Sequence, residues 1–205
     1  MTKNELLDDI AYARSIAEKG ATTPLLGSSI NLMWGILVVP TLIFHGLALL
    51  GKFPISSQNI GLIWAAYGVI GTLGSIYLGR KIDKQAGSTT QANQVGEALG
   101  ISMGLMLAAY AITTVIMVVT KDMPAFLFNM IIVFAFALIT IHMAVLGHLT
   151  KLRYIRIAAI AAGAATVISY LMVSSPNVYF FAAFGVILTQ IIPSLIGLSQ
   201  EPKNV

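Results

Sequence analysis

Five long stretches of this 205-residue chain contain no Asp, Glu, Lys or Arg. They cover residues 20–51, 53–79, 98–120, 123–150 and 157–200. The hydrocarbon core of a bilayer accepts a helix of about 20 mostly apolar residues, so each of the first four stretches can span it once. The fifth stretch is long enough for two spans. The pattern therefore predicts an all-α, polytopic membrane protein with six transmembrane helices.

The turns between these spans indicate how the helices are paired. The fifth uncharged stretch divides at residues 174–177, where two serines, Pro176 and an asparagine favour a turn. A proline also follows the first and third spans, at Pro54 and Pro124, and proline is tolerated at the start of a helix. We therefore expect three helical hairpins, with spans at residues 29–50, 58–79, 95–120, 123–149, 154–174 and 177–198.

The remaining charges alternate between the gaps. Of the 12 Lys and Arg residues, ten lie in the N-terminal segment, the second and fourth gaps, and the C-terminal tail. The other gaps hold only Lys52 and Lys121. Lys and Arg in short loops are retained on the cytoplasmic side. The distribution predicts a multi-pass protein of the bacterial cytoplasmic (inner) membrane with both termini in the cytoplasm.

The segments outside the spans complete the domain organisation. Residues 1–28 form an N-terminal cytoplasmic segment, 29–198 the six-helix transmembrane domain and 199–205 a cytoplasmic tail. Apolar residues on one side of residues 4–19, followed by Gly20, predict a short amphipathic helix. It is either a surface helix or a docking helix for a partner, and its low lysine content favours the surface helix. The first 27 residues lack the apolar core of a cleaved secretory signal.

Composition narrows the classes of function. The chain is 57% hydrophobic and only 10% charged, and it contains no cysteine, which excludes disulfides, thiolate metal sites and cysteine nucleophiles. The net charge of +4 is explained by positive loops at one membrane face, so no nucleic-acid partner is expected. Phosphate-binding, serine-hydrolase and zinc-protease motifs are absent from the sequence. We expect no catalytic residues, no metal and no cofactor.

Small residues recur at helical spacing in the second and third spans. Such stripes let two helix backbones approach closely and gain van der Waals contact that lipid cannot match. The two stripes predict that these spans pack tightly, either on each other or across an oligomer interface, and packing within the chain is favoured. The third-span stripe is Gly96, Gly100, Gly104 and Ala108; the second-span stripe is Gly61, Ala65, Gly68, Thr72, Ser75 and Gly79.

Glu97 is the only carboxylate near a span, and an ionisable residue at that depth is a functional candidate. It lies in the first turns of the third span, where it can reach interfacial water. Two interpretations follow: an ion pair with Arg153, Arg156 or Lys81, which is favoured, or a proton or cation site.

Three histidines raise the question of a metal or haem. His142 and His148 are six residues apart, about 240° around a helix, so they cannot share a metal. His45 lies in the outer half of the first span and His142 in the inner half of the fourth, which argues against a shared haem. We expect His148 to lie at the interface and His142 to be a hydrogen-bonded packing residue.

Gln190 and Thr189 fall near the middle of the sixth span, and Pro193 should interrupt the helical hydrogen bonds beside them. Freed carbonyls next to an amide could bind a polar ligand. The alternative is an interhelical hydrogen bond worth about 1 kcal/mol. The aromatic residues that lie toward span ends are interpreted as interfacial belt residues: Trp34, Trp64, Tyr154, Tyr179, Phe180 and Phe181.

These features favour a protein that acts by contact. Close-packing helix faces and short loops suit an accessory, assembly or regulatory subunit of a membrane complex. Its partners would be the lipid bilayer and other membrane proteins or a second copy of itself. The alternative is a transporter or channel for a small solute, ion or lipid, with a polar site near Gln190 and Glu97. Catalysis is disfavoured because no nucleophile and base, or set of metal ligands, lie at one depth.

Overall fold

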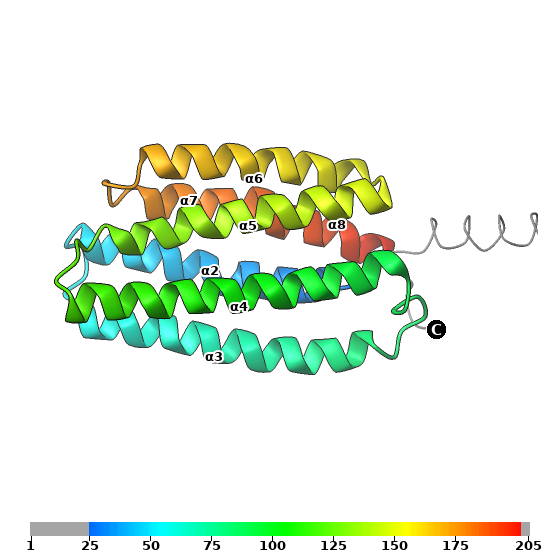
Figure 1. Ribbon diagram of the computed structural model, residues 1–205, viewed down its shortest axis with the longest axis horizontal. Helices are drawn as coiled ribbons and strands as arrows, with labels where there is room; N and C mark the ends of the chain where they lie inside the picture. The colour runs from blue at the N-terminus through cyan, green and yellow to red at the C-terminus, as the bar shows by residue number, and fades with distance from the viewer. Residues whose placement is uncertain (1–24, 202–205) are drawn as a thin grey trace, which may run out of the picture.

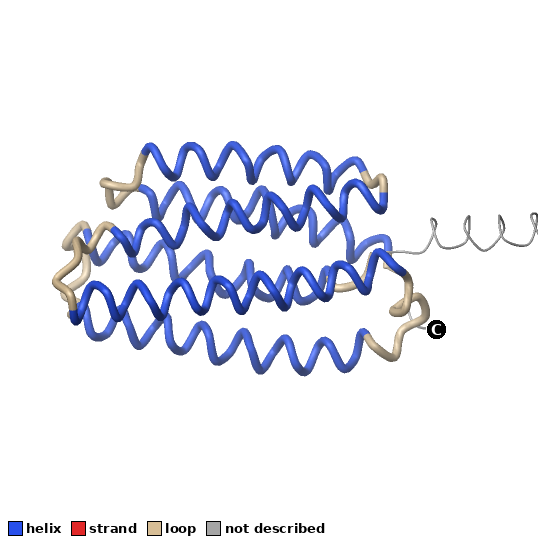
Figure 2. The backbone as a smooth tube through the Cα atoms, viewed as in Figure 1, coloured by secondary structure: helices blue, strands red, loops and turns tan. Residues whose placement is uncertain are grey.

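The protein folds as a bundle of long helices in a computed structural model that describes residues 25–201. Helices and turns account for this range, which contains no strand (Figure 2). The expected amphipathic helix over residues 4–19 lies outside the described residues. The helices are α2 (Ser28–Leu49), α3 (Ser57–Ile82), α4 (Gln91–Thr120), α5 (Leu127–Thr150), α6 (Arg153–Leu171), α7 (Val178–Val186), the π-helical turn η1 (Ile187–Ile191) and α8 (Ile192–Gln200).

Six helical segments are long and apolar enough to cross a membrane: α2 to α6, and the continuous α7–η1–α8 unit. The expectation of an all-helical chain with six such segments is confirmed. Two boundaries differ from the prediction by four residues. Helix α4 begins at Gln91, earlier than the predicted span, because its first helical turn is polar and does not contribute to an apolar stretch. Helix α5 begins at Leu127, later than the predicted span, because a turn occupies the residues after Thr120.

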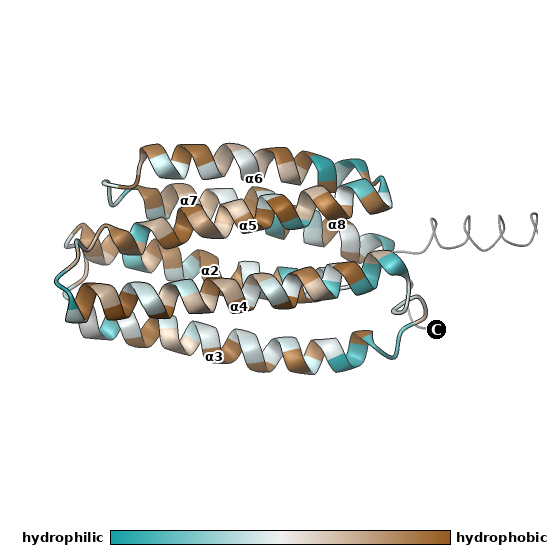
Figure 3. Ribbon diagram, viewed as in Figure 1, coloured by the Kyte–Doolittle hydropathy of each residue, from teal (hydrophilic) through white to brown (hydrophobic). Residues whose placement is uncertain are grey.

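The loops gather at two ends of the bundle (Figure 1). The α3–α4 and α5–α6 loops share one end with the C-terminus of α8, and the other three loops lie at the opposite end. We call the first the basic end, because Arg80, Lys81, Lys84, Lys151 and Arg153 belong to it. Hydrophilic residues concentrate there, whereas the helix bodies are mostly apolar (Figure 3). The charge alternation of the sequence thus corresponds to two physical ends.

The core is built from α2, α5, α6 and the α7–η1–α8 unit. Helices α5 and α6 form the most extensive contact, and α2 contacts α7, η1 and α8. Small residues of α6 make close approach possible, since Ala159, Ala162 and Ala165 are buried in one cluster with Phe136 and Tyr179. Helices within each expected hairpin do contact each other, but the largest contact joins α5 and α6, which belong to different hairpins.

Helices α3 and α4 are peripheral. Helix α3 packs mainly on α2, and α4 mainly on α5. Only 6% of the most apolar stretch of each is buried, compared with 44% for α5 and for the α7–η1–α8 unit. These two helices therefore present most of their surface to the surroundings of the chain.

The sixth span contains a π-helical turn in its middle. The Ile192 N–H donates to the Ile187 carbonyl, five residues back instead of four. Pro193 follows at the start of α8 and has no N–H to continue the regular pattern. The helix passes this point by widening for one turn, a feature that is frequent at functional sites. The irregularity expected from Pro193 is therefore present.

Candidate functional site

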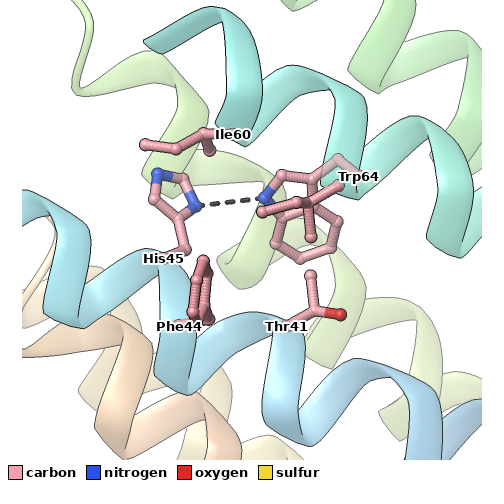
Figure 4. A pocket seen from close by; sticks show the side chains of 6 residues that line it. Thr41, Phe44, His45, Ile60 and Trp64 are labelled. Carbon is pink, nitrogen blue, oxygen red and sulfur yellow. Dashed lines mark hydrogen bonds between the residues drawn. The ribbon is translucent and has the colours of Figure 1, made fainter. Parts of the chain in front are cut away.

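A hydrogen-bonded aromatic cluster joins α2, α3 and α7. The Trp64 Nε1–H donates to His45 Nδ1 over 3.1 Å, and the second ring nitrogen of His45 points away from Trp64 (Figure 4). The Tyr179 ring centroid lies 4.0 Å from that of His45. Because indole N–H is only a donor, His45 Nδ1 must carry a lone pair. The contact therefore requires a neutral His45 with its proton on Nε2.

Two further rings extend this cluster along the α2–α3 contact. The Tyr67 ring lies between those of Trp34 and Trp64, with centroid distances of 5.1 and 5.4 Å in edge-on geometry. The Trp34 Nε1–H donates to Ser75 Oγ over 2.9 Å. We call Trp34, His45, Trp64, Tyr67 and Tyr179 the aromatic cluster. Both tryptophan N–H groups are satisfied, as buried indoles require.

The aromatic cluster corrects the interpretation of Tyr179 as a belt residue. Tyr179 is only 2% exposed, and the rings face one another between helices. The partners were missed because they are far apart in the sequence: 41 residues separate Trp34 from Ser75, and 19 separate His45 from Trp64. Position near a span end is a property of one helix and does not reveal such pairs.

Glycines of α3 allow the aromatic cluster to sit close to the backbone. A Cβ atom added at Gly71 would overlap the Trp34 ring, and one added at Gly74 would overlap the Met33 sulfur. Neither residue belongs to the predicted second-span stripe. Helix α3 therefore contacts α2 through Gly71 and Gly74, about a quarter turn away from that stripe.

The second-span stripe has little packed against it. A Cβ atom added at Gly61, Gly68 or Gly79 would meet no atom within 4 Å. Ser75 lies at its edge and accepts the Trp34 hydrogen bond. The alternating steps of four and three residues keep the stripe on one side of the helix. That side is not occupied by another described part of the chain.

The third-span stripe is only partly packed. A Cβ atom added at Gly96 would lie 3.3 Å from Leu146, and one at Gly100 would lie 3.8 Å from His142, both on α5. Gly104 has nothing within 4 Å, and Ala108 is exposed. Repeated steps of four residues rotate by about 40° each, so the stripe turns away from α5 along the helix.

The two stripes do not pack on each other within the described chain. Helices α3 and α4 are not among its extensively packed pairs, because each leans on a different core helix. The favoured interpretation of intrachain packing between the second and third spans therefore does not describe this structure. The alternative, a contact between chains, remains a prediction.

His142 is buried at the α4–α5 contact, with only 7% of its surface exposed. It is a packing residue, as expected, and Gly100 leaves room for its ring. Its Nδ1 has no hydrogen-bond partner, which differs from the expectation of a hydrogen-bonded histidine. No group of three or more His, Cys, Asp or Glu side chains is placed to hold a metal in residues 25–201.

Glu97 and Gln190 are not brought together. Glu97 is exposed on α4, and it forms no ion pair with Arg153, Arg156 or Lys81 in the described chain. The Arg156 Nε–H instead donates to the Gly147 carbonyl over 2.9 Å. Gln190 is half-buried in η1, beside Gly35 of α2.

The basic end carries two tertiary contacts that the sequence did not reveal. The Leu26 N–H donates to Asn93 Oδ1 over 2.8 Å, which ties the start of α4 to the start of α2. Glu201 lies just after α8, close to Ser28 at the start of α2, and its Oε1 atom is buried without a hydrogen-bond partner. Burial raises the pKa of Glu201 above its ordinary value of 4.5, and the nearby Ser28 only partly opposes that shift.

Residues 25–201 thus contain six helical segments compatible with an integral membrane protein. Comparison of the sequence and structure with protein families, curated proteins and solved structures finds no match. Function is therefore inferred from what the helix faces and side chains can do.

Proposed function

We propose that this protein is an integral membrane protein that acts by helix–helix contact, as an accessory, assembly or regulatory subunit of a membrane complex. The observation that carries the proposal is the unoccupied side of α3. Within residues 25–201 this helix packs mainly on α2, while a Cβ atom added at Gly61, Gly68 or Gly79 of its small-residue stripe would meet nothing within 4 Å. A second copy or another membrane protein can approach closely there.

The attachment of α3 supports this role because it leaves the stripe rigidly presented. The Trp34–Ser75 and His45–Trp64 hydrogen bonds hold α3 at two heights along α2. A helix fixed on one side loses little further freedom when a partner binds to the other side. Transport is less well supported, since Glu97 and Gln190 lie on helices that do not form a packed pair.

We further propose that the basic end faces the cytoplasm of a bacterial inner membrane and that both termini lie on that side. The Lys and Arg distribution supports this orientation. Because the chain has no cysteine, single replacements report on it directly. Ser88→Cys should react with an impermeant maleimide only after the membrane is permeabilised, whereas Met123→Cys should react in intact cells. The opposite labelling would reverse the orientation.

The contact function is tested by photo-crosslinking from α3 in native membranes. Gly68→Cys carries a benzophenone maleimide on the stripe. Leu73→Cys is the matched control, since it is 62% exposed and about 140° farther around the same helix. We expect a discrete adduct from Gly68→Cys and little from Leu73→Cys. Mass spectrometry then identifies the adduct as a second copy or a different protein. Equal, diffuse labelling from both positions would contradict the proposal.

A further inference from the structure

A shallow apolar groove runs along the outside of α2 at the basic end. Its volume is about 340 Å³. Helix α2 forms its floor, Leu78 of α3 forms one wall and Leu198 of α8 forms the other. The floor residues are Ser29, Leu32, Met33, Ile36 and Leu37.

The position of the groove matches one leaflet of a bilayer. Its floor runs from Ser29 to Leu37, which is about 12 Å along a helix axis. Half of a hydrocarbon core is about 15 Å thick. The groove therefore begins near the basic end of the spans and ends before the middle of the membrane. An occupant of this shape is apolar, extended and supplied by the leaflet at the basic end.

Charge at the mouth of the groove indicates what kind of lipid would fit. Lys81 follows Leu78 by three residues, so the two side chains lie on the same side of α3. Lys81 is exposed and forms no ion pair with a described residue. Ser29 adds a hydroxyl at the same end of the floor. A phosphate held here would find a cation and a hydrogen-bond donor.

Two carboxylates, Asp83 and Glu201, also lie at the basic end. Asp83 lies two residues after Lys81, a spacing that does not bring side chains together on a helix. Glu201 lies three residues after Leu198, but it is only partly exposed and its Oε1 atom is buried. Lys81, which is exposed, is therefore more accessible to a headgroup than the partly buried Glu201.

We propose that this groove is a phospholipid site, in which one acyl chain lies along α2 and the phosphate is held at Lys81. Cationic side chains between transmembrane helices at one membrane face recognise lipid headgroups in this manner. The site differs from the general lipid annulus because it holds one molecule and requires a phosphate. It is independent of the unoccupied side of α3, which lies on another side of that helix.

Native mass spectrometry of the full chain in mild detergent tests the proposal, with phosphatidylglycerol as the probe and diacylglycerol as its phosphate-free counterpart. Ile36→Trp fills the groove. Its matched control is Ile43→Trp, one heptad away on the same side of α2 and outside the groove; both isoleucines are exposed, at 56% and 39%. Lys81→Gln removes the headgroup contact, and Lys121→Gln at the opposite end is its control.

We expect one phosphatidylglycerol to be retained by the unaltered chain and by both controls, and to be lost from Ile36→Trp. Lys81→Gln should weaken phosphatidylglycerol retention about fivefold, the loss expected for one lysine near a lipid headgroup, and leave diacylglycerol retention unchanged. Equal retention by Ile36→Trp and Ile43→Trp would overturn the site. Equal retention of the two lipids by the unaltered chain would overturn the phosphate contact. Circular dichroism and gel filtration confirm that each variant is folded.

Discussion

Helix α4 and the α7–η1–α8 unit are equally apolar, yet 6% of the most apolar stretch of α4 is buried and 44% of that of the α7–η1–α8 unit. In water such helices would both be driven into a core. In a bilayer lipid is as apolar as leucine, so apolarity alone does not select between a core position and a peripheral one. Close-fitting small residues make the difference. Gly185 of α7 receives the Phe136 ring, whereas Gly104 of α4 meets nothing within 4 Å.

Gly185 of α7 and Gly68 of α3 differ in the same way, since only Gly185 has a side chain packed against it. Replacing these glycines should give the largest difference in the free energy of unfolding. A Cβ atom at Gly185 would lie 2.6 Å from the Phe136 ring, which is itself only 2% exposed and cannot retreat. Gly185→Ala should therefore lower the free energy of unfolding by about 1–3 kcal/mol. A Cβ atom added at Gly68 would meet no atom within 4 Å, so Gly68→Ala should raise the free energy of unfolding by up to about 1 kcal/mol, because alanine favours the helix more than glycine does. Denaturant unfolding in micelles measures both.

Equal losses at the two glycines would show that α3 is packed as tightly as the core, and would remove the distinction between core and peripheral helices. Gly163→Ala provides an intermediate test within the core helix α6. Its added Cβ would lie at an ordinary contact distance of 3.6 Å from Thr140. We expect a change of less than about 1 kcal/mol there.

The contact between α2 and α3 can be weakened by substitutions in the aromatic cluster. His45→Phe leaves the Trp64 indole N–H without an acceptor, and an unsatisfied donor of this kind costs about 1–3 kcal/mol. Trp64→Phe removes the donor instead. Because the two side chains share one hydrogen bond, the double variant should lose less stability than the sum of the single variants.

A double-mutant cycle in micelles measures this coupling, and His148→Phe at an exposed position of α5 serves as the control histidine. Exact additivity of His45→Phe and Trp64→Phe would mean that the hydrogen bond does not form. A coupling of about 1 kcal/mol would establish that α3 is fastened to α2 by a specific contact, as distinct from simple apolar packing.

Much of the architecture could be predicted because it depends on local quantities. Uncharged length located the six spans, and Pro193 marked the irregular turn of the sixth. The start of α4 was placed too late since hydropathy measures the apolar part of a helix, while the helix itself continues through polar residues such as Asn93. Span lengths and helix lengths are different quantities at membrane boundaries.

The sites could not be predicted to the same extent, because they depend on which helix lies beside which. The spacing of Gly61, Gly68 and Gly79 correctly described one side of a helix but not what that side meets. Gly71 lies near the stripe and receives Trp34 instead. The bond between His45 and Trp64 joins two spans whose relative rotation no single-span pattern contains.

Two carboxylates extend the comparison of core and periphery to electrostatics, with the smallest expected effect. Glu201 is half-buried against Ser28 where α2 and α8 meet, whereas Glu97 is exposed on α4. Because burial raises the pKa of Glu201, the folded state binds its proton more tightly than the unfolded state does. Stability is therefore lost as the pH rises from the ordinary value of 4.5 through the raised value.

Glu201→Gln removes that ionisation while retaining a side chain of the same shape. Between about pH 4 and 8, the stability of the Glu201→Gln variant should therefore fall less than the stability of the unaltered chain. Glu97→Gln makes the same replacement at an exposed position of α4 and is the matched control. Tyr154 near Glu201 does not ionise in this range, because tyrosine titrates near pH 10. Thermal unfolding in micelles over that range compares the three chains. Parallel profiles for Glu201→Gln and the unaltered chain would place Glu201 in solvent and the junction of α2 and α8 outside the buried core.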